Sequence, residues 1–157
     1  MHASDLETTL PLVDRGTPVL DAARMIAGER LPVLVITDDK GRPAAVISAV
    51  DVLGLLIPSY LRDDTSLSGV LDENGSDEVW AEARGHTVGE LLDDEGVDVH
   101  DLLTVEPDAT LVEVATLMAA ARASVALVTG GPPRFVTLPA LTDAILRLSD
   151  RSSGDDA

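Results

Sequence analysis

The amino-acid sequence contains no cysteine, few basic residues and few aromatic residues. Without cysteine, disulfides, thiol nucleophiles and cysteine-bound metals are excluded. Lys and Arg number 11 against 28 Asp and Glu, which gives a formal net charge of −17, and the aromatic side chains are one Phe, one Trp and one Tyr. Nucleic-acid binding requires cations that neutralise phosphates, and single strands also require aromatic rings on which bases stack. We therefore expect no nucleic-acid partner.

Long hydrophobic runs are also missing. No stretch reaches the roughly 18–20 apolar residues that cross a bilayer. The first ten residues are acidic and lack the basic region and apolar run of a secretory signal. These features predict a cytoplasmic protein with no membrane insertion. Ten arginines against a single lysine, together with many Ala, Gly and Val residues, indicate a GC-rich bacterial genome.

Residue patterns of catalysis and metal binding are absent as well. The three histidines, His2, His86 and His100, show no metal-ligand spacing. The acidic segment 93–101 does not match a calcium-binding loop. No glycine-rich phosphate loop and no nucleophile motif occurs. The sequence thus predicts no catalytic residue, no metal site and no resident cofactor, so we expect that the protein is not an enzyme.

What the chain does contain is an internal repeat. Residues 17–36, TPVLDAARMIAGERLPVLVI, align with residues 110–129, TLVEVATLMAAARASVALVT. Met25 lies 93 residues before Met118, and the two methionines occupy the same place in the two copies. Self-similarity of this kind indicates one structural unit used twice.

Each copy shows the same order of predicted elements. In the first copy Thr17 is expected to cap a helix that stops at Gly28, and in the second copy Thr110 begins the corresponding helix with a T-x-x-E capping box. A buried strand, a turn and a second strand follow in both copies. The second strands lead into short helices over 49–56 and 138–148. The predicted unit is β-α-β-β-α, present twice.

The repeats divide the chain into four parts. We assign residues 1–56 to the first unit, 57–85 to an acidic, partly helical connector, 86–150 to the second unit and 151–157 to a disordered tail. Within the connector, DEVWAEAR is typical of a short helix capped by Ser76. The acidic residues of the connector form either a solvated surface or a binding face for a basic partner.

The doubled β-α-β-β-α unit resembles the pair of cystathionine-β-synthase-type (CBS) domains known as a Bateman module. The resemblance is carried by residues 17–53 and, more loosely, by 110–129 with FVTLPAL at 135–141, and it covers about residues 3–56 and 86–148. It implies a mixed fold of the α+β or α/β class, in which two pseudo-symmetric units pack as one module with up to two ligand clefts. It also implies adenosine-containing ligands and assembly of such modules into dimers.

Ser48 and Asp51 are the central candidates for ligand binding. They stand at the start of a predicted helix, whose free N–H groups suit a phosphate. The Asp51 carboxylate can accept hydrogen bonds from both vicinal hydroxyls of a ribose. The same Ser-x-x-Asp spacing is that of a capping box, which only satisfies the helix end. The residues leave both interpretations open, and the CBS resemblance favours ligand binding because Ser-x-x-Asp matches the ligand motif of the family.

The resemblance adds five further candidates to the first cleft. Thr87 and Val88 match positions that line the cleft, and Arg30 matches a position that reaches a phosphate. Arg30 has an equally good interpretation as an ordinary surface arginine. Val46 and Ile47 are candidates for contact with a base, although strand residues of this type ordinarily belong to the core.

The second cleft departs from the family pattern. Thr137 corresponds to Ser48, but Ala140 stands where the ribose-binding aspartate of the family would lie. We expect this second site to be weak, repurposed or empty.

The leading functional hypothesis is a non-catalytic regulatory module that binds an adenosine-containing ligand and modulates a separate partner protein. A transporter and a metabolic enzyme are both candidates for this partner. The ligand is left open among AMP, ATP, related adenine nucleotides and S-adenosylmethionine. The alternative is a ligand-free dimerisation or scaffold module with decayed clefts. Asp51 favours the first hypothesis and Ala140 the second. In both cases we expect a homodimer formed through the apolar segments VDVLGLLI and LPALTDAILRL.

Overall fold

The computed structural model describes residues 1–93 and 99–154, and the chain divides into two compact units. The continuous unit comprises Pro11–Asp101, and the split unit joins Met1–Leu10 to Leu102–Ala157. Each unit contains one copy of the repeat. This division differs from the boundaries at 1–56 and 86–150, because the segment that precedes each repeat packs in the unit of the other repeat.

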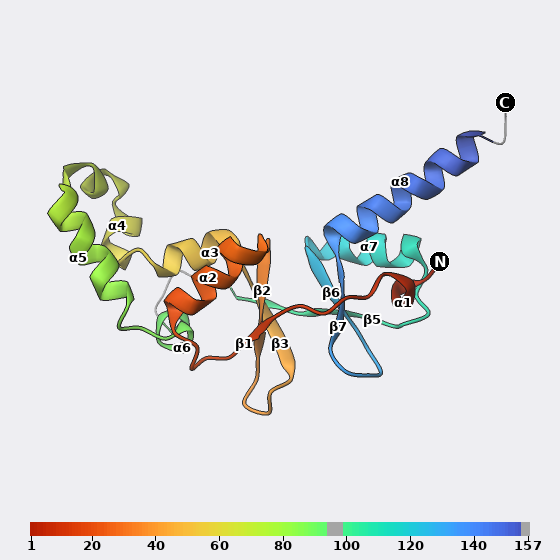
Figure 1. Ribbon diagram of the computed structural model, residues 1–157, viewed down its shortest axis with the longest axis horizontal. Helices are drawn as coiled ribbons and strands as arrows, with labels where there is room; N and C mark the ends of the chain where they lie inside the picture. Colours follow the sequence, from red (N-terminus) through yellow and green to blue (C-terminus); the bar gives the residue numbers. More distant parts are fainter. Residues whose placement is uncertain (94–98, 155–157) are drawn as a thin grey trace. The chain divides into compact units, whose positions relative to one another are not determined.

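A four-stranded sheet forms the base of the continuous unit. Its strand order is β1 (Leu12–Val13), β2 (Val33–Thr37), β3 (Pro43–Ser48) and β4 (His100–Asp101), with β1 parallel to β2 and the other pairs antiparallel. Helices α2 (Val19–Glu29) and α3 (Ala49–Leu55) lie together on one face of this sheet (Figure 1). Between the sheet and the two helices lies an apolar core that includes Leu34, Ile47 and Val52.

The described part of the continuous unit also contains α4 (Ser59–Asp63), the 3₁₀ helix η1 (Thr65–Val70), α5 (Glu73–Ala83) and α6 (Val88–Leu92). Helix α5 begins earlier than expected because Asp72, and not Ser76, is its cap. The Asp72 carboxylate accepts a hydrogen bond from the Gly75 N–H at 2.8 Å. The connector is therefore largely helical, and Val79 and Ala83 of α5 are buried.

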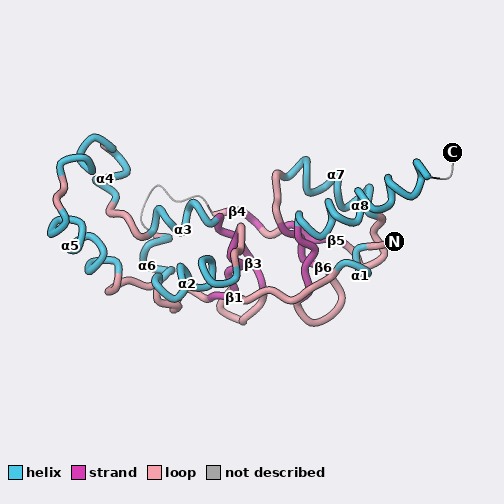
Figure 2. The backbone as a smooth tube through the Cα atoms, turned by 45° about the horizontal axis from the view of Figure 1, so that its top comes forward, coloured by secondary structure: helices cyan, strands magenta, loops and turns pink. Residues whose placement is uncertain are grey.

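Helix α6 packs beside the start of α2 (Figure 2). The Val88 N–H donates to the Thr17 carbonyl and the Gly89 N–H donates to the Arg15 carbonyl, both at 2.8 Å. The Arg15 guanidinium in turn donates to the Gly89 carbonyl at 3.0 Å. Val88 is only 2% exposed and belongs to the core of the continuous unit. The segment that leads into the second repeat thus completes the unit of the first.

The split unit repeats this arrangement with a three-stranded sheet. Its strands are β5 (Leu103–Val105), β6 (Val125–Val128) and β7 (Arg134–Thr137), and its helices are α1 (Ala3–Leu6), α7 (Leu111–Ala121) and α8 (Leu138–Gly154). β5 is parallel to β6 and β6 is antiparallel to β7. The Ala3 N–H donates to the Ala109 carbonyl at 2.9 Å, so α1 joins the second repeat as α6 joins the first.

The order β-α-β-β-α is confirmed in both repeats, and the helix caps are confirmed in part. Thr110 caps α7 as expected, since its hydroxyl accepts a hydrogen bond from the Glu113 N–H at 3.2 Å. Thr17 does not cap α2, because its hydroxyl pairs with Asp14 and the helix begins at Val19. Helix α2 also passes the expected stop at Gly28 and ends with Arg30 in the left-handed conformation.

Helix α8 is longer than the expected 138–148. It continues to Gly154, so residues 151–154 are helical and not a disordered tail, whereas 155–157 lie outside the described residues. An ion pair between Asp143 and Arg147 at 2.8 Å, one turn apart, supports the helix. The hydroxyls of Ser152 and Ser153 donate to carbonyls one turn back, which gives these polar residues helical partners. None of the helices described combines the length and apolar character needed to cross a bilayer.

Candidate functional site

Ser48 and Asp51 meet where β3 ends and α3 begins. Ser48 is the cap of α3, and its hydroxyl oxygen accepts a hydrogen bond from the Asp51 N–H at 3.1 Å. The same hydroxyl donates to Oδ2 of Asp51 at 2.7 Å. Ser48 therefore satisfies the helix end and also fixes the orientation of the Asp51 carboxylate.

The Asp51 carboxylate does not close a capping box. A complete box is present at α6, where Glu90 accepts from the Thr87 N–H while Thr87 accepts from the Glu90 N–H. At α3 only the serine half of such a box is made. Within residues 1–93 and 99–154, no group donates to Oδ1 of Asp51, and the side chain is partly exposed. One carboxylate oxygen is thus held in place and the other faces no protein donor there.

Arg30 lies at the same end of the continuous unit. It follows α2 with φ 53° and ψ 45°, and its N–H donates to the Ile26 carbonyl. Two residues later, the Pro32 carbonyl accepts a hydrogen bond from the Ala49 N–H at 2.9 Å, which ties this segment to the start of α3. The Arg30 side chain is exposed and forms no ion pair with any residue that the structure describes.

Val46 and Ile47 point to opposite faces of β3, because side chains alternate along a strand. Ile47 is 1% exposed and packs in the core beneath α2 and α3, so it has no surface for a ligand. Val46 lies on the same face as Ser48 and is half-buried. Of the two, only Val46 remains a candidate for contact with a base.

Thr87 and Val88 stand at the start of α6, and their place in a ligand cleft stays a prediction. They contact the beginning of α2, where Thr87 pairs with Pro18, whereas Arg30 lies at its end. An 11-residue helix is about 16 Å long at 1.5 Å per residue. The Thr87 hydroxyl is occupied by its capping box and the Val88 side chain is buried. The geometry thus gives these two residues a structural role in holding α6.

The second repeat carries the same framework without the carboxylate. Thr137 accepts a hydrogen bond from the Ala140 N–H at 3.4 Å, and the Leu138 N–H donates to the Ser124 carbonyl at 2.9 Å. Arg122 follows α7 with φ 51°, in the same conformation as Arg30. Arg122 was not among the residues predicted for the site. It comes into register with Arg30 only when the alignment of the repeats is shifted by one residue after the helix, from an offset of 93 to 92.

These features define a tandem module of two α/β units, each with a hydroxyl residue and an arginine at the junction of its elements. The family model of the CBS domain matches residues 3–58. A CBS domain-containing protein of unknown function from Kribbella flavida is 33% identical, with a TM-score of 0.73 over 92% of this chain and 99% of its own. The chain therefore belongs to the CBS-domain proteins. No curated protein matches it.

More distant CBS structures share the fold. CBSX2 from Arabidopsis thaliana, described as a CBS-pair protein, is 20% identical, with a TM-score of 0.65 over 95% of this chain and 96% of its own. CBSX2 has also been determined in complex with AMP; that structure is 21% identical, with a TM-score of 0.61 over 94% and 98% of the two chains. CBS-domain pairs are typically regulatory rather than catalytic.

Proposed function

We propose that this protein is a non-catalytic regulatory module that binds an adenine nucleotide through Ser48, Asp51, Arg30 and Val46, and that it modulates a separate partner protein. The observation that carries the proposal is the Asp51 carboxylate. Ser48 holds one of its oxygens at 2.7 Å, and the other faces no donor among the described residues. A carboxylate fixed in this way is suited to accept hydrogen bonds from the two hydroxyls of a ribose. The AMP complex of CBSX2 supports the choice of ligand.

The backbone of Arg30 provides independent support. Positive φ favours glycine, and a larger residue held there costs free energy that a function can justify. Arg30 and Arg122 occupy this conformation in both repeats, at φ 53° and 51°. We infer that Arg30 supplies the cation for a phosphate in a chain whose net charge is −17. The site with Ala140 lacks the carboxylate, so we propose that it binds nucleotides weakly or not at all.

A ligand panel tests this function. AMP, ADP, ATP and S-adenosylmethionine would each be added to the protein while its melting temperature is measured. A ligand that binds only the folded state, present at 100 times its Kd, stabilises that state by about 2.7 kcal/mol. We expect at least one adenine nucleotide to raise the melting temperature and to bind with one equivalent per chain. No shift with any of the four would favour the ligand-free scaffold.

We also propose a homodimer in a bacterial cytoplasm, and the dimer has a specific surface. Val50 and Leu53 on α3 are 76% and 58% exposed, and Leu146 on α8 is 58% exposed. These residues lie in the two apolar segments expected at the interface, and a second copy would remove them from water.

The dimer prediction is that Leu53→Glu weakens self-association at least about tenfold without unfolding the protein, because a charge would be buried at the interface. Sedimentation velocity at micromolar concentration measures the effect. Val112→Glu is the matched control, since Val112 is 76% exposed on α7 and lies outside both segments. A monomeric wild-type protein at these concentrations would contradict the proposal.

A further inference from the structure

The continuous unit contains a hollow that the proposed nucleotide site does not use. It has a volume of about 230 Å³ and lies where the end of α3 meets α4, α5 and α6. Ser48 and Asp51 are at the opposite end of α3, and neither of them lines this hollow. Sites for drug-sized ligands usually exceed about 300 Å³. The hollow is therefore better matched to a single large side chain than to a whole nucleotide.

The lining of the hollow is mostly apolar. Leu55 and Val79 form a buried part, at 5% and 6% exposed, and Leu56 and Leu91 pack against the core of the continuous unit. Tyr60 also lines the hollow, and it is 52% exposed. A half-exposed aromatic ring beside an apolar hollow is typical of protein–protein interfaces, in which one buried side chain of the partner supplies much of the affinity.

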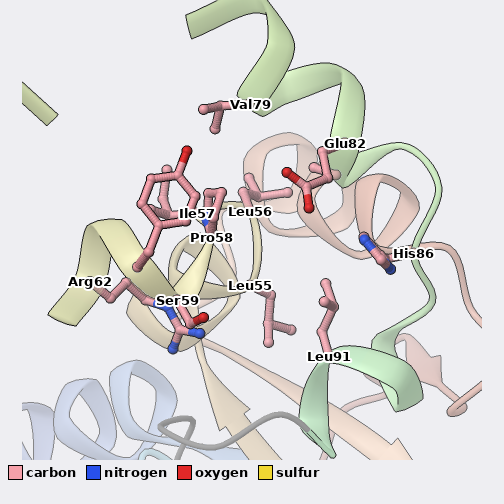
Figure 3. Close-up of a pocket in the computed structure, with 12 residues that line it drawn as sticks. Leu55, Leu56, Ile57, Pro58, Ser59, Arg62, Val79, Glu82, His86 and Leu91 are labelled. Carbon is pink, nitrogen blue, oxygen red and sulfur yellow. The ribbon is translucent and has the colours of Figure 1, made fainter. Parts of the chain in front are cut away.

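The side of the hollow that α5 forms is acidic. Figure 3 shows Glu82 and Arg62 on opposite sides of Leu55. Arg62 already has an interaction partner. Glu82 lies one turn after Glu78 on α5, both side chains are exposed, and neither forms an ion pair with a residue in the ranges 1–93 and 99–154. Like charges one turn apart repel each other, so a cation beside this face of α5 would stabilise it.

We propose that this hollow is the docking site of the separate partner protein and that it binds a basic amphipathic helix of that partner. An apolar side chain of the partner helix fills the hollow against Leu55 and Tyr60, and its lysines or arginines pair with Glu82 and Glu78. Grooves between helices commonly bind amphipathic helices in this way. The proposal rests on the proposed function, because a regulatory module requires a surface that its partner contacts.

Charge complementarity selects this occupant over an acidic or an uncharged helix. Helix α5 contains four acidic residues and no basic one, and the whole chain has a net charge of −17. A basic segment is attracted to such a surface and an acidic segment is repelled. The apolar lining adds the second requirement, since lysines and arginines alone would leave the hollow unfilled.

A synthetic peptide serves as the probe. It is a fluorescently labelled helix of about 18 residues, with leucine on one face and lysine on the other. Fluorescence anisotropy at physiological salt follows its binding to the whole protein, and we expect saturation at one equivalent per chain. A peptide with glutamate in place of lysine, and another with alanine in place of leucine, should each bind at least about tenfold more weakly. Equal binding of either control peptide would overturn the proposal, as would no saturable binding of the probe at micromolar concentration.

Glu82→Gln locates the charged contact. The variant is expected to bind the probe about three- to fivefold more weakly, because an exposed ion pair is lost. Glu73→Gln is the matched control, since it removes the same charge from an exposed residue of α5 that does not line the hollow. Nine residues separate the two glutamates, about two and a half helical turns, so they face opposite sides of α5. Equal losses would show that the peptide responds only to net charge, which would overturn the proposal.

Tyr60→Ala and Trp80→Ala locate the apolar contact. Both rings are about half exposed, at 52% and 45%, but only Tyr60 lines the hollow. We expect Tyr60→Ala to weaken probe binding about tenfold and Trp80→Ala to leave it unchanged. The opposite result would refute the assignment. Nucleotide binding is measured separately by thermal shift with AMP, so failure of the peptide leaves the nucleotide proposal standing, and absence of an AMP shift leaves the docking result readable.

Discussion

Replacement of Asp51 by alanine is expected to weaken the binding of AMP about 100-fold. If Asp51 holds the ribose as proposed, the variant loses hydrogen bonds from both hydroxyls to a charged acceptor. Each contributes about 1.5–3 kcal/mol at most, and competition by water reduces the sum. A total of about 2.8 kcal/mol corresponds to the factor of 100. Asp51→Asn keeps the size of the side chain and one acceptor oxygen, so its loss should be smaller. Calorimetric titration of the three proteins with AMP measures both effects.

The stability of the Asp51→Ala variant distinguishes ribose binding by Asp51 from a role in capping α3. Ser48 caps α3 with its own hydroxyl, and that hydrogen bond to the Asp51 N–H survives in the alanine variant. We therefore expect Asp51→Ala to lower the free energy of unfolding by less than the ~1 kcal/mol that loss of a cap costs. An unchanged AMP affinity together with a loss of about 1 kcal/mol or more would show that Asp51 only supports the helix.

Arg30→Gly is expected to raise the stability of the protein and, at the same time, to lower its affinity for AMP. Glycine adopts positive φ without strain, so the variant should melt at a higher temperature than the wild type. If Arg30 contacts a phosphate, the same variant should bind AMP more weakly and adenosine about as well as before. A more stable protein with undiminished AMP affinity would remove Arg30 from the site.

A methyl group at position 89 is expected to destabilise the protein, although alanine is the better helix former. In Gly89→Ala, the new Cβ would lie 2.8 Å from both the Cβ and the carbonyl oxygen of Arg15. The carbonyl cannot move aside cheaply, because it accepts the hydrogen bond from the Gly89 N–H. Overpacking of this kind costs about 1–3 kcal/mol. Urea unfolding of the variant measures the loss of free energy.

Gly28→Ala is the matched control, with the opposite expected sign. Gly28 also lies inside a helix, but a Cβ there meets no atom within 4 Å. The substitution should stabilise the protein by about 0.5–1 kcal/mol through helix propensity alone. If Gly89→Ala proved as stable as Gly28→Ala, α6 could not be packed against Arg15 as described.

The repeat and its order of elements could be predicted from the sequence, because both depend on local patterns. Thr110 illustrates this, since the T-x-x-E spacing that signals a helix start involves only residues close together in the sequence. The site pair Ser48 and Asp51 was recognisable for the same reason, because its two members are three residues apart. Local spacing does not reveal the neighbours of a residue in space.

The surroundings of the other candidates depend on contacts between distant parts of the chain. Thr87 and Val88 were assigned to the cleft on their position alone, whereas the partners that hold them, Pro18 and Thr17, lie about 70 residues earlier. Ile47 was offered to a ligand, but the packing of α2 and α3 against β3 buries it. The sequence does not predict the left-handed backbone of Arg30, because glycine is the residue that usually adopts this conformation after a helix.

The segment that precedes each repeat packs in the unit of the other repeat. This arrangement sets an order for folding during synthesis. The continuous unit, Pro11–Asp101, leaves the ribosome as one uninterrupted stretch, so its sheet and helices can assemble before the rest of the chain exists. The first ten residues cannot join their unit at that time. Ala3 requires the carbonyl of Ala109, and Thr8 requires the backbone of Phe135. Residues 1–10 are therefore made before the rest of the split unit but fold late, because their partners lie more than 100 positions downstream.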